Sequence, residues 1–305
     1  MANAPGLLAV DVGGSQIKVT VLDAEPAGGL TVLDHAYRPT PKGADGTATA
    51  HAVVDAVAAL AAEHAGVRAV GVVVPGLVHD GVGVYSANLG WRDFPFVAEL
   101  TARIGLPVAL GHDVAACGLA ELRLGAARGY RQAVVMPIGT GIAAALIMDG
   151  AVRTGDGYVG EVGHVDVGHD EPCRCGQTGC LEMIASSPAI ARRYAARTGR
   201  QLPGAAEVVA AAENGDPVAA AVWDDALDAV ASALRMLTTL LGPEVVVLGG
   251  GLAQAGPRLV EPVAKRLADQ LTFQRMPELR LAELGYEAGS LGAGLLALDL
   301  LEGAR

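Results

Sequence analysis

Residues 7–24 read LLAVDVGGSQIKVTVLDA, an apolar run that ends in two glycines and is followed by alternating apolar and polar residues. The first run predicts a buried strand, and the period-2 alternation predicts a second strand that completes a hairpin. Asp11 stands just before the turn, which is formed by Gly13, Gly14 and Ser15. Glycine there lets backbone N–H groups approach an anion closely, because no Cβ stands in the way. A carboxylate beside such a turn suits Mg²⁺ held through water.

Strands and helices alternate along the rest of the chain. We expect strands at residues 67–76, 107–113, 131–150 (two strands around a glycine turn) and 244–251. We expect helices at residues 44–66, 114–125, 216–241 and 289–301. This alternation places the chain in the α/β class.

Two further glycine turns follow predicted strands, at residues 139–141 and 249–251. Each turn alone is typical of an ordinary hairpin. None ends in Gly-Lys-Ser/Thr and none reads G-x-G-x-x-G, which disfavours a Walker-type NTPase and a dinucleotide dehydrogenase. Three such turns, spread along the chain, indicate two lobes whose phosphate loops face a cleft.

The composition fits a soluble globular protein. The chain has 305 residues, which favours two lobes over one simple core. The net charge of −11 argues against general binding to nucleic acids or acidic membranes, because there is no basic stripe to neutralise phosphates. The N-terminus lacks the pattern of a signal peptide and no long apolar stretch predicts a membrane span, so we expect a cytoplasmic protein.

Three of the four cysteines fall within eight residues. They follow the pattern C-x-C-x4-C, with two glycines that can bend the chain between them: Cys173, Cys175, Gly176, Gly179 and Cys180. Such a short loop can turn three thiolates onto one point, where a fourth ligand completes a tetrahedral structural zinc site. His164 and His169 are both within reach, and spacing alone does not choose between them. Three free thiols are the alternative, because a cytoplasmic disulfide is disfavoured.

The residues around these cysteines resemble the signature of the ROK family (repressors, open reading frames and kinases). Residues 161–164, EVGH, are similar to its E-x-G-H motif, and residues 173–182, CRCGQTGCLE, are similar to its C-x-C-G-x-x-G-C-x-E motif. Other segments follow in family order: DVGGSQIK, VPGLV, SANLGW, the aspartate of GHD, IGTG, LGGGL and AGSLGAGLLA. The resemblance extends from Leu7 to about Leu300.

The resemblance implies a two-lobed, actin-like (ribonuclease H-like) sugar kinase fold with an inter-lobe cleft. The small lobe would comprise residues 1–112 and 290–305, and the large lobe residues 113–289. In this superfamily the first two turns hold phosphates and the third lies against adenosine. Lys18 is a further candidate for a phosphate contact, although a lone lysine on an alternating strand equally fits a solvated face. The implied nucleotide site is Asp11, Gly13, Gly14, Ser15, Lys18, Gly139, Thr140, Gly141, Gly249, Gly250 and Gly251.

The family also implies the metal and sugar ligands. Its E-x-G-H histidine is the fourth zinc ligand, which implies a structural site of His164, Cys173, Cys175 and Cys180. Zinc would pin a loop whose two ends carry sugar-binding groups. The implied sugar site is Gly76, Asn88, His112, Asp113, Glu161, His164 and Glu182.

Phosphoryl transfer to a sugar hydroxyl needs a phosphate cradle, a divalent cation and a carboxylate that takes the hydroxyl proton. Asp113 is the candidate catalytic base, because it ends the strand at residues 107–113. From the residues alone, a helix N-cap explains this aspartate equally well. The family's catalytic aspartate occupies the same place, which favours the base.

The residues around the base depart from the family. Glucokinase-like members usually read Glu-Asn-Asp-Ala-Asn, whereas residues 111–115 read GHDVA. The family asparagine touches sugar hydroxyls, and a neutral histidine offers a different set of donors and acceptors. We therefore expect His112 to favour a hexose altered near C3 or C4, or an amino sugar, over glucose. The alternative is that His112 points away and a water fills the gap, leaving an ordinary glucokinase.

The resemblance implies an ATP-dependent hexose kinase that uses Mg²⁺ and phosphorylates the C6 hydroxyl of glucose or a related hexose. One alternative is an amino-sugar kinase acting on 3-amino-3-deoxyglucose (kanosamine) or N-acetylmannosamine. A sugar-responsive regulator without catalysis is disfavoured, because only six residues precede the first strand and the chain is acidic. The family leads us to expect a homodimer, and the sequence leaves polyphosphate open as the donor.

Overall fold

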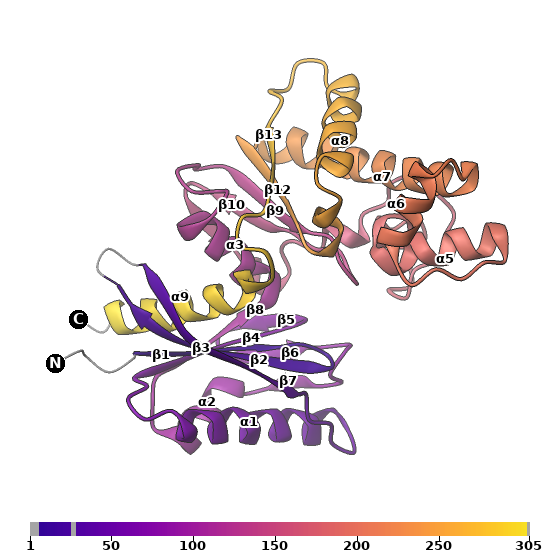
Figure 1. Ribbon diagram of the computed structural model, residues 1–305. Helices are drawn as coiled ribbons and strands as arrows, with labels where there is room; N and C mark the ends of the chain where they lie inside the picture. Colours follow the sequence, from indigo (N-terminus) through magenta and orange to yellow (C-terminus); the bar gives the residue numbers. More distant parts are fainter. Residues whose placement is uncertain (1–5, 26–28, 304–305) are drawn as a thin grey trace. The chain divides into compact units, whose positions relative to one another are not determined.

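The computed structural model describes residues 6–25 and 29–303, which form two compact units (Figure 1). Unit 1 comprises the chain up to Ala120, the segment Thr154–Val159 and the chain from Tyr286 onward. Unit 2 comprises Glu121–Arg153 and Gly160–Gly285. The lobe boundaries expected after residues 112 and 289 lie near these divisions but not at them. Residues 1–5 and 304–305, the outer ends of the expected small lobe, lie outside the described residues.

Unit 1 is built on a five-stranded sheet of order β3-β2-β1-β4-β8. Its strands are β1 (Leu7–Val12), β2 (Gln16–Ala24), β3 (Leu30–Pro39), β4 (Ala69–Val74) and β8 (Val108–His112). β2 pairs antiparallel with β1 and β3, whereas β1, β4 and β8 run parallel. The hairpin predicted from the first quoted stretch is confirmed. β4 is buried along its whole length, as expected for a central strand of a parallel segment covered on both faces.

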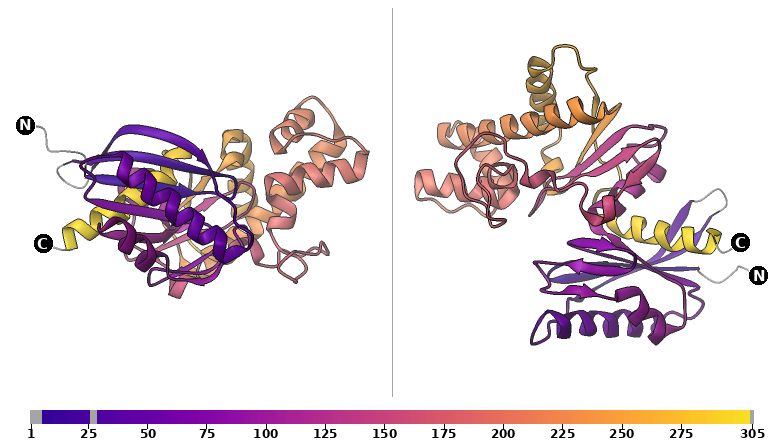
Figure 2. Two further views of the ribbon diagram at one scale, coloured as in Figure 1. Left: turned by 90° about the horizontal axis from the view of Figure 1, so that it is seen from below. Right: turned by 180° about the vertical axis from the view of Figure 1, so that it is seen from behind.

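Helices cover both faces of this sheet (Figures 1 and 2). α1 (Gly46–Glu63) and α2 (Phe96–Ile104) pack together on one face, and α9 (Ala288–Gly303) lies on the other. α1 begins where the Asp45 side chain accepts a hydrogen bond from the Ala48 N–H, an N-cap that fixes the start of the helix. α3 (Asp113–Leu124) follows β8 directly. A small sheet and a 3₁₀ turn complete the unit: β5 (Leu77–His79), β6 (Val82–Tyr85), β7 (Arg92–Phe94) and η2 (Gly155–Gly157).

Unit 2 repeats the strand order of unit 1, as β11-β10-β9-β12-β13. Its strands are β9 (Ala133–Pro137), β10 (Ala145–Met148), β11 (Ala151–Arg153), β12 (Val245–Gly249) and β13 (Glu278–Leu281). Here β9, β12 and β13 run parallel. The helices are α4 (Glu182–Ala185), α5 (Ser187–Thr198), α6 (Ala205–Glu213), α7 (Pro217–Leu241) and α8 (Pro257–Gln270), with 3₁₀ turns η3 (Val162–His164), η4 (Gly251–Ala255) and η5 (Gly285–Glu287, at the end of the unit).

This topology determines where functional residues can gather. Parallel strands bring their carboxyl ends to one edge of a sheet, the usual place for ligand binding in α/β proteins. In unit 1 that edge carries the first glycine turn, Gly76 and Asp113. In unit 2 it carries the second and third glycine turns, which follow β9 and β12. Within the described residues, no helix is both long enough and apolar enough to cross a membrane.

α9 approaches the unit 1 sheet closely through glycines. A Cβ on Gly71 of β4 would stand 1.8 Å from the carbonyl oxygen of Ala293. A Cβ on Gly292 would stand 2.1 Å from the carbonyl oxygen of Ala116 in α3. The second contact explains why α9 has glycine at position 292 although glycine is a poor helix former.

We expect Gly71→Ala to lower the free energy of unfolding by roughly 1–3 kcal/mol, because the added methyl has to push α9 off the sheet. Urea denaturation would measure the change. Gly303→Ala, at the open end of the same helix with no atom within 4 Å of the added Cβ, is the matched control. Equal midpoints for the two variants would contradict the close packing.

Candidate active site and metal centre

The first glycine turn joins β1 to β2 in unit 1. The Gly13 N–H donates to the Gln16 carbonyl at 2.8 Å, and the Thr40 hydroxyl donates to the Gly13 carbonyl at 2.7 Å. A Cβ at Gly13 would lie 2.9 Å from the Gln16 oxygen, so the turn requires glycine there. A Cβ at Gly14 would lie 3.9 Å from the Asn88 Cβ. The structure therefore brings Asn88, a sugar-site candidate, beside the predicted phosphate turn.

Asp11 and Asp113 interact electrostatically at the same edge of the sheet. Burial and, to a smaller extent, the negative charge of Asp113 raise the pKa of Asp11 to about 6, with Lys18 acting in the opposite direction. Burial also raises the pKa of Asp113 to about 6, against the lowering effect of the Val114 N–H and its own N–H. The negative charge of Asp113 thus makes ionisation of Asp11 more costly. A divalent cation near Asp11 would relieve this repulsion.

The contacts of Asp113 distinguish between the two roles considered for it, a catalytic base and a helix N-cap. The Val114 N–H donates to Asp113 Oδ1 at 2.7 Å, and His112 Nε2 lies 3.0 Å from the same oxygen as an ion pair. An N-cap carboxylate bonds to the second or third N–H after it, and no such bond is found in the described part of the chain. Asp113 therefore does not act as an ordinary N-cap, and 36% of its side chain remains exposed.

Two other candidates in unit 1 have structural contacts. Lys18 Nζ donates to the Tyr286 carbonyl at 2.8 Å, so its ammonium is anchored and is not simply solvated. Gly76 has φ = +103°, and a Cβ there would stand 2.2 Å from the Tyr85 carbonyl oxygen. Gly76 is therefore needed for the chain to leave β4, whether or not its backbone contacts a ligand.

The second and third glycine turns of unit 2 pack against each other. Gly250 has φ = +72°, and a Cβ there would lie 2.5 Å from the Ile138 carbonyl oxygen. That oxygen accepts the Leu252 N–H at 3.0 Å, and the Ile138 N–H donates to the Gly249 carbonyl at 3.0 Å. The parallel pairing of β9 with β12 brings together two turns more than 100 positions apart in the sequence.

Residues from both ends of the cysteine loop reach the second turn. Glu182 Oε2 accepts the Ile142 N–H at 3.0 Å, and a Cβ at Gly163 would stand 2.1 Å from the Ile142 carbonyl oxygen. Glu161 lies two residues before Gly163, and its side chain has no hydrogen bond or ion pair with the rest of the described chain. The E-x-G-H motif, the second glycine turn and Glu182 thus form one cluster, in which Glu161 keeps a free carboxylate.

Four side chains of unit 2 form a possible metal centre. The ligand atoms of His164, Cys173, Cys175 and Cys180 all lie within 4.8 Å of one another. Cys173 Sγ is 3.7 Å from His164 Nδ1, and Cys175 Sγ is 3.6 Å from Cys180 Sγ. Ligands about 2.3 Å (sulfur) or 2.0 Å (nitrogen) from a tetrahedral zinc ion are about 3.6–3.8 Å apart. The four residues therefore fit zinc, and the sulfur separation rules out a disulfide between Cys175 and Cys180.

The second histidine near the loop is engaged elsewhere. His169 Nε2 lies 3.0 Å from the Cys180 carbonyl oxygen, and its Nδ1 accepts the Glu171 N–H at 3.1 Å. These contacts use both ring nitrogens, so the geometry favours His164 as the fourth ligand. Burial raises the pKa of the Cys180 thiol to about 12, and a bound cation is what would displace its proton.

The two predicted bends of the loop are confirmed. Gly176 and Gly179 have φ = +92° and +88°. The Cys173 N–H donates to the Gln177 carbonyl at 2.8 Å, and the Gly176 N–H donates to the Cys173 carbonyl at 3.0 Å. Backbone bonds thus form a tight turn around the cysteines.

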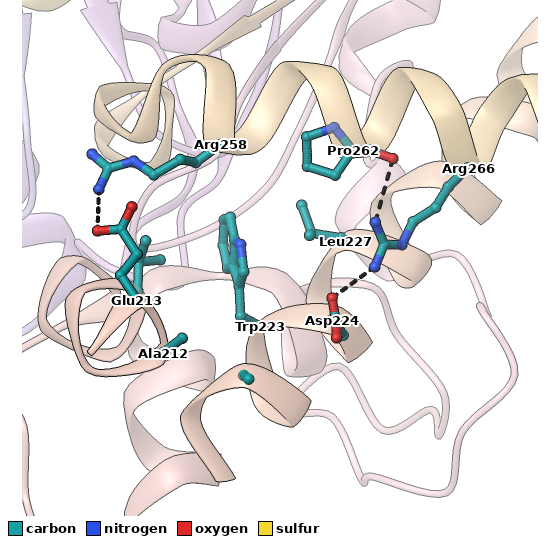
Figure 3. Close-up of a pocket in the computed structure, with 10 residues that line it drawn as sticks. Ala212, Glu213, Trp223, Asp224, Leu227, Arg258, Pro262 and Arg266 are labelled. Carbon is teal, nitrogen blue, oxygen red and sulfur yellow. Dashed lines mark hydrogen bonds and ion pairs between the residues drawn. The ribbon is translucent and has the colours of Figure 1, made fainter. Parts of the chain in front are cut away.

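A separate pocket of about 320 Å³ lies among α6, α7 and α8 of unit 2 (Figure 3). Trp223 and Leu227 of α7 line it opposite Pro262 of α8. Two ion pairs flank these apolar groups, each with a 2.7 Å contact: Arg258–Glu213 and Arg266–Asp224. Because both guanidinium groups already have carboxylate partners, we assign no anionic substrate to this pocket.

The sequence did not point to three of the residues that shape these sites. Thr40 holds the first turn from β3, and Ile142 joins the second turn to Glu182. A Cβ at Gly289, on α9, would stand 2.6 Å from Asp11 Oδ2. Only Gly289 had a sequence signal, because it lies in the AGSLGAGLLA segment.

Known proteins resemble this chain in sequence and in structure. Residues 7–300 match the ROK family. A glucokinase of Halalkalibacterium halodurans is 32% identical over 94% of this chain and 93% of its own length. An N-acetyl-D-glucosamine kinase of Escherichia coli O157:H7 is 32% identical over 94% of this chain and 98% of its own length. A crystal structure of a ROK family glucokinase from Streptomyces griseus, in complex with glucose and AMPPNP, is 28% identical, with a TM-score of 0.78 over 96% of this chain and 99% of that one.

The raised pKa values of Asp11 and Asp113 predict how stability depends on pH. The folded protein binds these protons more tightly than the unfolded chain, so stability falls as pH rises from about 4 to about 6 and stays lower above that. Asp113→Asn removes one of the two ionising groups, so we expect it to raise the melting temperature at pH 8 and to change it little at about pH 4. Asp269→Asn, at the exposed end of α8, is the control. An Asp113→Asn protein that is no more stable than wild type at pH 8 would contradict the burial of this charge.

Proposed function

Because this chain belongs to the ROK family, we propose that it is an ATP-dependent hexose kinase that transfers the γ-phosphate to the C6 hydroxyl of a hexose. The α/β fold expected from the resemblance, that of an actin-like sugar kinase, is confirmed by the solved ROK structures it resembles. The observation that supports the chemistry best is the place of Asp113. It follows the carboxyl end of β8, acts electrostatically on Asp11 beside the first glycine turn, and titrates near neutrality.

Asp113 is the proposed general base. A base is most effective when its pKa lies near the working pH, since it is then both ionised and able to hold a proton. The raised pKa of Asp113, about 6, meets this condition. Asp113 would take the C6 hydroxyl proton as the oxygen attacks the γ-phosphorus and ADP leaves.

The glycine turns are the proposed nucleotide site. The N–H groups of the first turn, residues 13–15, and the second, residues 139–141, would bind phosphate oxygens, and residues 249–251 would lie against adenosine. Asp11 suits the Mg²⁺ that accompanies ATP, because a cation offsets its repulsion with Asp113. Lys18 would contribute positive charge beside Asp11, from the position fixed by its bond to Tyr286.

The proposed sugar ligands combine fixed and free polar groups. Glu161 has a free carboxylate that can accept from sugar hydroxyls, and Glu182 retains one oxygen after its bond to Ile142. The others are Gly76, Asn88, His112, Asp113 and His164. Such preorganised acceptors suit a neutral polar ligand, since a site built to hydrogen-bond a hydroxyl discriminates against analogues that leave it unpaired.

Zinc is the proposed occupant of the cysteine loop. His164, Cys173, Cys175 and Cys180 would hold it, and the closed ligand set would make it structural. Backbone bonds join the two arms of the loop, since the Leu181 N–H donates to the Val165 carbonyl and the Val167 N–H donates to the Gly179 carbonyl. A metal there would fix Glu161 and Glu182 relative to the second glycine turn.

An amino-sugar kinase is the second candidate. The observation that favours it is His112, which replaces the asparagine found beside the base in glucokinase-like members, and one relative is an N-acetyl-D-glucosamine kinase. The ratio of kcat/KM for kanosamine or N-acetylmannosamine to that for glucose separates the two. A homodimer remains a prediction from the family, and a cytoplasmic location remains a prediction from the sequence. Polyphosphate stays open as the donor.

We expect Asp113→Asn to lower kcat by roughly 10²–10⁴-fold while binding of ATP and sugar is kept, because the amide preserves shape and loses only the basic oxygen. Steady-state kinetics with the best hexose substrate would measure this, with Asp269→Asn as a control for a lost surface charge. A kcat near that of wild type would leave Asp113 with no catalytic role.

We expect purified protein to hold one zinc ion per chain. His164→Ala should lose or loosen the metal, whereas His169→Ala should keep it, because only His164 places a nitrogen among the three sulfurs. Elemental analysis by mass spectrometry would give the zinc content of all three proteins. Protein free of zinc with full activity, or the reverse result for the two histidines, would contradict the proposed centre.

A further inference from the structure

Two groups contact the same oxygen of the proposed base. The Val114 N–H donates to Asp113 Oδ1 at 2.7 Å, and His112 Nε2 lies 3.0 Å from it. Across residues 6–25 and 29–303, the hydrogen bonds and ion pairs of this carboxylate with other residues all fall on Oδ1. Oδ2 is therefore the oxygen left to receive a proton.

His112 is placed for this contact by the fold. It is the last residue of β8 and pairs with Val74 of the neighbouring parallel strand. Gly111 before it packs so closely against α9 that a Cβ would lie 2.5 Å from Leu296 Cδ1. Only 19% of the His112 side chain is exposed, so the ring has little freedom to swing into solvent. The imidazole is thus a rigid partner for a carboxylate that would otherwise rotate about its terminal bond.

The charges around Asp113 give the contact a second effect. Asp11 on β1 is a like charge close enough to interact with it, and Lys18 on β2 acts on Asp11. The His112 ring lies 3.0 Å from Oδ1, and an N–H donated from that position favours the ionised carboxylate in spite of the neighbouring charge of Asp11. The contact therefore both orients the carboxylate and favours its ionised form.

We infer that His112 is a positioning residue for the phosphoryl transfer: it holds Asp113 Oδ1 so that Oδ2 faces the sugar hydroxyl and takes its proton. This inference rests on the proposed kinase function. In this inference His112 orients Asp113, whether or not it also contacts the sugar. An asparagine at this position is shorter and places its amide nearer the backbone, so the arrangement belongs to this chain's Gly-His-Asp sequence.

The test compares His112→Leu, which keeps bulk and removes the N–H, with His112→Gln, whose amide N–H reaches about as far from the backbone as imidazole Nε2. We expect His112→Leu to lower kcat by about 10-fold or more, with KM for ATP unchanged, because misplacement of a catalytic group reduces turnover rather than binding. His112→Gln should restore kcat to within about 3-fold of wild type. Melting temperatures would confirm that both variants fold.

A second readout does not depend on turnover. The pKa of Asp113, followed by the ¹³C NMR signal of its carboxyl carbon, should rise in His112→Leu, because the ionised carboxylate loses its partner, and rise less in His112→Gln. The other charged groups on elements that pack against β8 are unchanged across the variants: His79, Glu99, Arg103, Asp299 and Glu302.

The outcomes separate the inference from the proposed function. A His112→Leu variant with wild-type kcat and an unshifted Asp113 pKa would overturn the inference, as would a raised KM for the sugar at unchanged kcat, which would make His112 a sugar ligand only. Wild-type protein that phosphorylates no sugar would instead refute the kinase proposal, and the NMR titration would still show whether His112 holds Asp113.

Discussion

Burial of two like charges, Asp11 and Asp113, is the constraint on which the candidate site depends. Both carboxylates stand at the carboxyl edge of the unit 1 sheet, and burial makes the charge on each costly. The topology leaves no other arrangement, because β1 and β8 flank β4 in parallel and must end at the same edge. Positive charge has to come from elsewhere. Lys18 supplies part of it, and Mg-ATP would supply more, which would link the state of the proposed base to nucleotide binding.

In unit 2 the constraint is different, because a polar loop has too little apolar surface to be ordered by hydrophobic burial. The segment from Glu161 to Glu182 contains exposed glycine and charged residues, and only a few of its side chains are buried. Backbone bonds across the loop and the His164–cysteine cluster take the place of a hydrophobic core. The ends of the loop then contact the second glycine turn at Ile142, and through Ile138 that turn contacts the third. The candidate metal centre, the sugar candidates of unit 2 and its two glycine turns thus belong to one connected structure.

The central elements could be predicted from the sequence because the apolar pattern of each one lies within a short segment of the chain. The hairpin at residues 7–24, β4, β8, α1 and α7 followed from the patterns of apolar residues, and the cysteine spacing located the candidate metal cluster. The edge strand β3 was missed because most of its residues are exposed and show no period-2 burial, and α8 was missed because Pro262 interrupts its pattern. The choice of His164 over His169 and the contact of His112 with Asp113 depend on side-chain directions and tertiary packing, which a sequence pattern does not contain.

The chemistry proposed for this site is transfer of the γ-phosphate of ATP to the C6 hydroxyl of a hexose. The most direct measurement is ³¹P NMR of the products formed from Mg-ATP with a panel of hexoses and amino-hexoses, since it identifies both the acceptor and the position of the new phosphate ester. The account predicts ADP and a sugar 6-phosphate in equal amounts for at least one of these sugars. Phosphate on another hydroxyl, or hydrolysis of ATP without any sugar phosphate across the panel, would contradict it.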